Sequence, residues 1–220
     1  MTLLSWSGGK DAAWTLHRMR QQGVAVAALI TTVTEGYDRV SMQGIRRDVL
    51  HAQAAASGLP LIEVRIGPAC DNAAYEAAFA GGLQRARGRW PQLREIAFGD
   101  LFLQDIRDYR VEMCARLGWQ VQTPLFGSDT GSLARDMQSG GLQAALCCVD
   151  TQQLSADFAG RDFDASLLRD LPRNVDPCGE NGEFHSCVHA GPMFDRPIMV
   201  ERGETILRDS RFAYTDFKLL

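Results

Sequence analysis

Ser7-Gly8-Gly9-Lys10-Asp11 follows a short apolar run that starts at Leu3, and it leads directly into a helical pattern. Two consecutive glycines let an anion approach the backbone and permit the positive φ angles that turn amide N–H groups inward. The start of a helix adds unpaired N–H groups and partial positive charge, and Lys10 adds a full charge. The stretch therefore predicts a strand, a phosphate-binding loop and a helix.

The alternative interpretation is an ordinary glycine turn beside a solvated lysine. The chain has only two lysines, Lys10 and Lys218, among 23 basic residues. Because arginine fills the other surface positions, a lysine inside the loop favours compact contact with phosphate. The spacing matches neither the Walker A loop nor the dinucleotide fingerprint, so the pattern indicates a different nucleotide-binding loop.

The composition predicts a soluble, cytoplasmic protein of one large or two small domains. The chain has 220 residues, of which 45% are hydrophobic and 23% charged. No apolar run approaches the roughly 20 residues of a membrane span. A net charge of −4 argues against a broad nucleic-acid surface. The six cysteines form no C-x-x-C pair, which favours reduced thiols.

The first part of the chain alternates strand-like and helix-like segments. Strands are expected at 24–33, 61–66, 95–100 and 120–125, and helices after the glycine loop and at 41–57, 72–87 and 105–117. This alternation predicts a doubly wound parallel sheet. Since ligands bind at the carboxyl ends of such strands, we expect Ile30, Thr31 and Thr32 near an adenine, with Gly99 and Asp100 at the same edge.

From about residue 127 the pattern changes, and we expect a smaller α+β domain over 127–220 that packs on the sheet domain of residues 1–126. Asp129 or Thr130 can cap a helix that runs to Ser139. A buried strand is expected at 142–149, a short helix at 165–171 and short strand-like pieces at 197–217.

A second polar motif, Glu180-Asn181-Gly182-Glu183-Phe184-His185, concentrates two carboxylates, an amide and an imidazole between glycines. It predicts a loop that binds and orients a substrate across a cleft from the phosphate loop; the alternative is a solvated polar hairpin. Further on, His185, Cys187 and His189 alternate along one face of an expected strand. Such a trio can bind zinc or simply form a polar strand face.

The first motif resembles the pyrophosphatase loop S-G-G-x-D-S, with Ala12 where the last serine usually stands. Together with Asp176-Pro177-Cys178-Gly179 and the second motif, it resembles the diphthine–ammonia ligase family over essentially the whole chain. The resemblance implies a HUP-type sheet domain of the adenine nucleotide alpha hydrolase superfamily, followed by a distinctive C-terminal domain. Its implied activity is ATP-dependent amidation of a carboxylate with ammonia, through an acyl-adenylate, with release of AMP and pyrophosphate.

The leading hypothesis therefore assigns three groups of residues. Catalytic residues would be Lys10, Glu180, Glu183 and His185. ATP would be bound by Ser7, Gly8, Gly9, Lys10, Asp11, Ile30, Thr31, Thr32, Gly99 and Asp100. Mg²⁺ would be bound by Asp11 and Asp100. The expected partners are ATP or AMP, ammonia and a carboxylate-bearing acceptor, without membrane or nucleic acid; a homodimer stays open.

Two other functions remain open. The first is a non-catalytic adenine-nucleotide sensor, which is consistent with Ala12 in place of the usual serine hydroxyl. The second is sulfur transfer to a tRNA base, which would need reactive cysteines such as Cys178 and Cys187. The preference for arginine over lysine also favours a bacterial source. Because bacteria lack diphthamide, such a source implies an acceptor other than diphthine.

Overall fold

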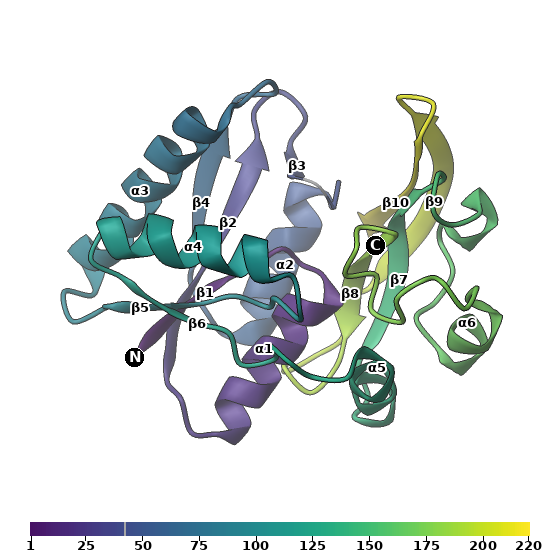
Figure 1. Ribbon diagram of the computed structural model, residues 1–220, viewed down its shortest axis with the longest axis horizontal. Helices are drawn as coiled ribbons and strands as arrows, with labels where there is room; N and C mark the ends of the chain where they lie inside the picture. Colours follow the sequence, from purple (N-terminus) through teal and green to yellow (C-terminus); the bar gives the residue numbers. More distant parts are fainter. Residues whose placement is uncertain (42) are drawn as a thin grey trace.

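The computed structural model describes residues 1–41 and 43–220, and it contains two β-sheets that lie side by side with helices around them (Figure 1). The strands are β1 (Thr2–Ser5), β2 (Val26–Thr34), β3 (Arg39–Val40), β4 (Leu61–Ile66), β5 (Glu95–Ala97), β6 (Gln120–Gln122), β7 (Gln143–Asp150), β8 (Phe184–Ala190), β9 (Val200–Arg208) and β10 (Phe212–Leu219). The α-helices are α1 (Lys10–Gln21), α2 (Arg47–Ser57), α3 (Asn72–Arg89), α4 (Gln104–Arg116), α5 (Thr130–Ser139) and α6 (Ala165–Asp170), and Ala156–Phe158 forms a 3-10 helix. No helix within the described ranges is long and apolar enough to cross a bilayer.

Strand β1 lies at the centre of the first sheet. It pairs in parallel with β2 on one side and with β5 on the other, while β4 extends the β2 side and β6 the β5 side. The chain runs outward to β4 and then crosses back to β5, so the strand order reverses at the carboxyl end of β1. In open α/β sheets this reversal point is where ligands bind. The predicted doubly wound sheet is confirmed, although the short β3 runs antiparallel to the end of β2 and makes the sheet mixed.

Helices cover both faces of this sheet. The apolar sides of α1 and α2, including Leu16 and Leu50, belong to a core that continues into the second sheet. On the opposite face, α3 and α4 bury Phe79 and Met113 in a separate core. The second sheet thus packs against the α1 and α2 side of the first (Figure 1).

The second sheet is antiparallel, with the order β8-β7-β10-β9. The short pieces expected at 197–217 are instead one long hairpin of β9 and β10, which turns at Asp209 and Ser210 with positive φ angles. At the other edge, the N–H of Val188 in β8 donates to the carbonyl oxygen of Gly8, at 3.0 Å. This contact makes the second sheet a wall of the site at β1.

The start of α2 is the main error among the predicted elements. A helix was expected from Ser41, but α2 begins at Arg47. Before it, the chain forms β3 and a tight turn in which Gly44 adopts a φ of 69° and its N–H donates to the carbonyl of Val40 at 3.0 Å. Residue 42, inside the predicted helix, lies outside the described residues. The turn requires a residue with a positive φ angle at position 44, and the spacing of apolar residues that predicted the helix carries no information about that angle.

Candidate active site

A cleft of about 560 Å³ lies at the carboxyl ends of β1, β2 and β5, where the segment 176–186 of the second half closes it. The predicted site residues that line this cleft are Ser7, Gly9, Lys10, Asp11, Ile30, Thr31, Thr32, Gly99, Asp100, Glu180 and His185. Gly8 and Glu183 belong to the same two motifs but are not among the lining residues. The structure therefore brings the two sequence motifs together around one space.

Gly8 shapes the loop that follows β1. Its φ is 79°, and a Cβ atom there would lie 2.7 Å from the side-chain oxygen of Gln53. Gln53, fully buried in α2, donates through Nε2 to the carbonyl of Gly8 at 3.0 Å and to that of Val188 at 2.7 Å. Its Oε1 accepts from Trp6 Nε1 at 3.0 Å. One amide thus fixes the loop to both α2 and β8, a role that the sequence did not indicate.

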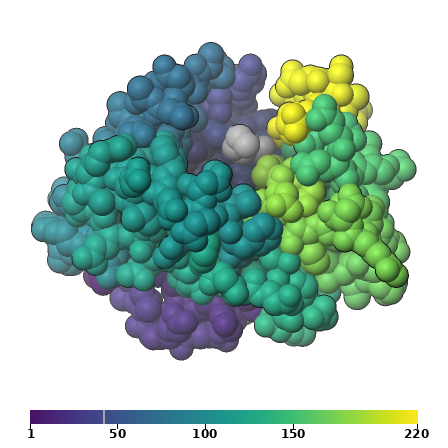
Figure 2. All heavy atoms as spheres, in the orientation of Figure 1, coloured from purple at the N-terminus to yellow at the C-terminus, as the bar shows by residue number. Residues whose placement is uncertain are grey.

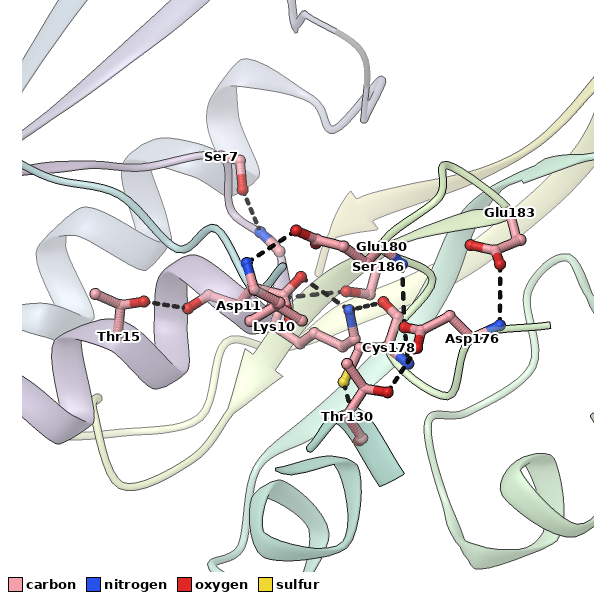
Figure 3. A network of polar contacts seen from close by, with 12 residues as sticks. Ser7, Lys10, Asp11, Thr15, Thr130, Asp176, Cys178, Glu180, Glu183 and Ser186 are labelled. Atoms are coloured by element: carbon pink, nitrogen blue, oxygen red, sulfur yellow. Dashed lines mark hydrogen bonds and ion pairs between the residues drawn. The ribbon is translucent and has the colours of Figure 1, made fainter. Parts of the chain in front are cut away.

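Lys10 is buried beneath the 176–186 segment (Figure 3). Its Nζ donates to Asp11 Oδ2 at 2.8 Å and to the carbonyl oxygen of Cys178. The rings of Phe163 and Phe184 lie within 5.8 Å of the same ammonium group. Burial lowers the pKa of Lys10 and the Asp11 carboxylate raises it; the net direction is upward, so the side chain is charged at neutral pH. Two of its three N–H donors therefore have acceptors in the protein.

Asp11 and Asp100 lie on neighbouring segments, because the first turn of α1 touches Gly99 in the segment that follows β5. A Cβ atom at Gly99 would lie 2.9 Å from the carbonyl carbon of Asp11, so only glycine allows this approach. Asp11 Oδ1 and Asp100 Oδ2 are both buried and have no hydrogen-bond partner among the described residues. Burial raises the pKa of Asp100, against the effect of Arg110. Two carboxylate oxygens without donors fit a divalent cation that receives its other ligands from phosphates and water.

The two glutamates of the second motif lie on opposite sides of their loop (Figure 3). Glu180 lines the cleft, and its Oε1 accepts from the N–H of Leu101 at 2.8 Å. Burial raises the pKa of Glu180, with a further contribution from Asp11. Glu183 is 2% exposed, and its carboxylate accepts from the backbone N–H groups of Asp176 and Asn181, both at 2.9 Å. Glu183 therefore holds the loop closed from behind.

His185 and Ser186 bring β8 into the site. Burial lowers the pKa of His185 to about 4, so its imidazole is neutral at pH 7. Ser186 Oγ accepts from the N–H of Lys10 at 3.1 Å. His189, by contrast, lines different cavities beside Asp162. Across residues 1–41 and 43–220, no group of three His, Cys, Asp or Glu side chains is arranged to hold a metal.

One side of the cleft is aromatic, a feature that no pattern in the sequence indicated. Tyr75 and Phe79 stack at 5.8 Å between centroids, and Phe79 lies 6.4 Å from Phe98. All three line the cleft, together with Ile30 and Ile66. Such a wall is suited to a flat heteroaromatic ring.

The two cysteines considered for sulfur transfer are buried. Burial raises the pKa of Cys178 and of Cys187 to about 12, so both are protonated thiols at neutral pH. Because the thiolate is the reactive form, neither side chain is set up as a nucleophile.

The sequence matches two known family models. The model of the diphthamide synthase N-terminal domain matches residues 1–121, and that of the diphthamide synthase C-terminal domain matches residues 129–217. The diphthine–ammonia ligase of Schizosaccharomyces pombe is 28% identical over 222 residues, which cover 93% of this chain but only 36% of the yeast protein. The diphthine–ammonia ligases of Danio rerio and Homo sapiens are 26% and 25% identical, over 96% and 93% of this chain and 91% and 84% of their own lengths. Since the two matched domains together span nearly the whole sequence, the chain belongs to the diphthamide synthase family.

Proposed function

We propose that this protein is an ATP-dependent ligase that converts a carboxylate into an amide with ammonia. In the first step a carboxylate oxygen of the acceptor attacks the α-phosphorus of ATP, and the bond to the β-phosphate oxygen breaks to release pyrophosphate. In the second step ammonia attacks the acyl carbon, loses a proton and displaces AMP. The observation that carries the proposal is that the glycine loop at the β1 switch point and the segment 176–186 line one cleft.

The nucleotide would lie with its base against Tyr75 and Phe79 and its phosphates at the start of α1. Backbone N–H groups and the helix dipole favour an anion there, and Lys10 adds a charge from below. Mg²⁺ would be held by Asp11 and Asp100, whose free oxygens fit it, and it would neutralise charge on the departing pyrophosphate.

Ammonia is a nucleophile only when neutral, and its attack releases a proton that a base must accept. Glu180 is suited to this role because it lines the cleft and burial raises its pKa. His185 faces the same space as a neutral imidazole and can orient the acceptor by hydrogen bonding. Glu183 contributes indirectly, since it fixes the loop that carries Glu180.

A second groove provides room for the acceptor. It has a volume of about 860 Å³ and lies between β3 and the β9–β10 hairpin, and Val40 and Ser41 line both this groove and the nucleotide cleft. Figure 2 shows the hollow between the N-terminal half and the yellow hairpin. An acceptor that lies here would reach the α-phosphate past Ser41.

A nucleotide sensor is the second candidate, because Ala12 lines the cleft where the loop pattern usually places a hydroxyl. One experiment separates the two. The protein is incubated with ATP, Mg²⁺, ammonium and a panel of carboxylates that includes diphthine, the acceptor named for the relatives. Acceptor-dependent AMP and pyrophosphate support the ligase, tight binding without turnover supports the sensor, and ADP with phosphate contradicts both.

A further inference from the structure

More carboxylates than cations line the nucleotide cleft. Among the described residues that line it, three are carboxylates, Asp11, Asp100 and Glu180, and two are cations, Lys10 and Arg110. Lys10 is almost fully buried and is already bound to Asp11 and to the carbonyl of Cys178. A triphosphate entering this cleft therefore meets one cation with an accessible side chain, Arg110, which is 32% exposed.

Arg110 projects from α4, and its two contacts fix its position while most of its N–H donors remain available. Its guanidinium stacks on Phe98, with 4.5 Å between its central carbon and the ring centroid. One nitrogen donates to Asp100 Oδ1, while Asp100 Oδ2 accepts nothing among the described residues. An arginine has five N–H donors in a planar fork that matches phosphate oxygens, so an end-on contact with one carboxylate oxygen leaves most of them available.

The position of Asp100 places this guanidinium at the phosphate end of the cleft. Gly99 packs against the backbone of Asp11 and Ala12, so Asp100 lies beside the first turn of α1, where the phosphates are expected. Arg110 also touches the aromatic wall, because its guanidinium stacks on Phe98. A cation here would contact the phosphates that leave.

We propose that Arg110 is the side chain that binds the β- and γ-phosphates of ATP, and that Asp100 keeps it in position while the cleft is empty. This assignment rests on the proposed nucleotide-dependent function. On binding, the guanidinium shifts from Asp100 to the polyphosphate. AMP, which lacks those phosphates, would gain nothing from Arg110.

The test compares ATP, AMP and pyrophosphate binding by calorimetry, with a non-hydrolysable ATP analogue in place of ATP. Arg110→Gln should weaken binding of the analogue and of pyrophosphate by at least about tenfold, the range for a charge-assisted hydrogen bond, and leave AMP binding within about twofold. Arg107→Gln is the matched control. Arg107 lies one turn earlier on α4, stacks on Phe126, donates to Thr123 and does not line the cleft.

Arg110→Lys keeps the charge and should recover part of the lost affinity. Equal losses for AMP and the analogue, or unchanged binding of both by folded Arg110→Gln protein, would overturn the assignment while leaving the proposed function intact. A wild-type protein that binds neither nucleotide would overturn the proposed function and this assignment with it. Thermal melting of each variant shows whether it is folded.

Discussion

The ammonium group of Lys10 donates a hydrogen bond to the carbonyl oxygen of Cys178, a residue 168 positions further along the chain. The phosphate-binding loop and the second motif are therefore in direct contact beneath the cleft. A lysine that sequence patterns assign to phosphate also holds the loop that carries Glu180.

Lys10→Met should consequently reduce both turnover and stability. It removes the charge that pairs with Asp11 and frees the carbonyl of Cys178. Because Lys10 is buried, loss of one partner should lower the free energy of unfolding by roughly 3 kcal/mol. Urea titration measures the stability, and hydrogen exchange should show faster exchange in 176–183. Wild-type exchange there, with lost turnover, would limit Lys10 to phosphate binding.

Glu180→Gln and Glu183→Gln form a matched pair three residues apart. Glu183→Gln removes a buried charge that accepts from two backbone N–H groups, and it should lower stability by about 2 kcal/mol. Glu180→Gln keeps an oxygen for Leu101 but loses its basicity, so stability should hold while acceptor-dependent AMP formation falls at least about a hundredfold. If Glu180→Gln lowered stability and Glu183→Gln lowered turnover instead, Glu183 would be the catalytic base and Glu180 the residue that fixes the loop.

Gly99→Ala should weaken ATP binding and stability together. The new methyl group would lie 2.9 Å from the carbonyl carbon of Asp11, and separating β5 from α1 should cost about 1–3 kcal/mol. Gly67→Ala provides the control, since nothing lies within 4 Å of its added Cβ. Melting temperatures and ATP titrations of both variants give the comparison. Equal melting temperatures and equal ATP affinities would show that the close contact between Gly99 and the backbone of Asp11 is not needed.

Ala12→Ser should strengthen ATP binding. Residue 12 is the third residue of α1 and lines the cleft, so a hydroxyl there can donate to a phosphate. A hydrogen bond to a charged group contributes about 1.5 kcal/mol or more, or about tenfold in affinity. Calorimetry measures the change. Weaker binding by the serine variant would indicate a site adapted to alanine and would favour the sensor.

His185 predicts a loss of stability in mild acid. Its pKa is about 4 in the folded protein against 6.5 for the free side chain, because burial disfavours the charged form. The unfolded chain therefore binds the proton first, and stability falls as the pH drops from 6.5 toward 4, by up to roughly 3 kcal/mol. Urea titrations at pH 7, 5.5 and 4.5 should show this fall in the wild type and a smaller one in His185→Gln. If the stability of the wild type and of the variant fell equally with pH, His185 would be accessible to water and its burial would not cause the loss.

The sequence was sufficient to predict the parallel strands of the first sheet and the loop at its centre. Ser7 to Asp11 combines a strand, two glycines and a helix start, and each of these signals is local. The same holds for α5, where Asp129 caps the helix by accepting from the N–H of Ser132 at 2.8 Å. Such features depend on neighbours in the sequence, so a pattern can reveal them.

The remaining parts of the site depend on contacts between distant segments. Gln53 reads as one polar residue in an alanine-rich helix, and Arg110 as one of many arginines on a surface helix. Gln53 gains a partner where α2 packs against β8, and Arg110 gains one where α4 packs against the segment that follows β5. Glu183, expected to be catalytic, does not line the cleft, and the density of charge in a motif does not say which carboxylate faces the ligand.

One continuous core joins α1 and α2 to the second sheet, and this affects whether either half of the chain can fold by itself. Family models divide the sequence near residue 125, and a fragment cut there would expose the apolar side of both helices to water. We therefore expect neither fragment to remain monodisperse by itself and the two, co-expressed, to reassemble in trans. For this chain, a division into two family models would then not mean two units that fold independently.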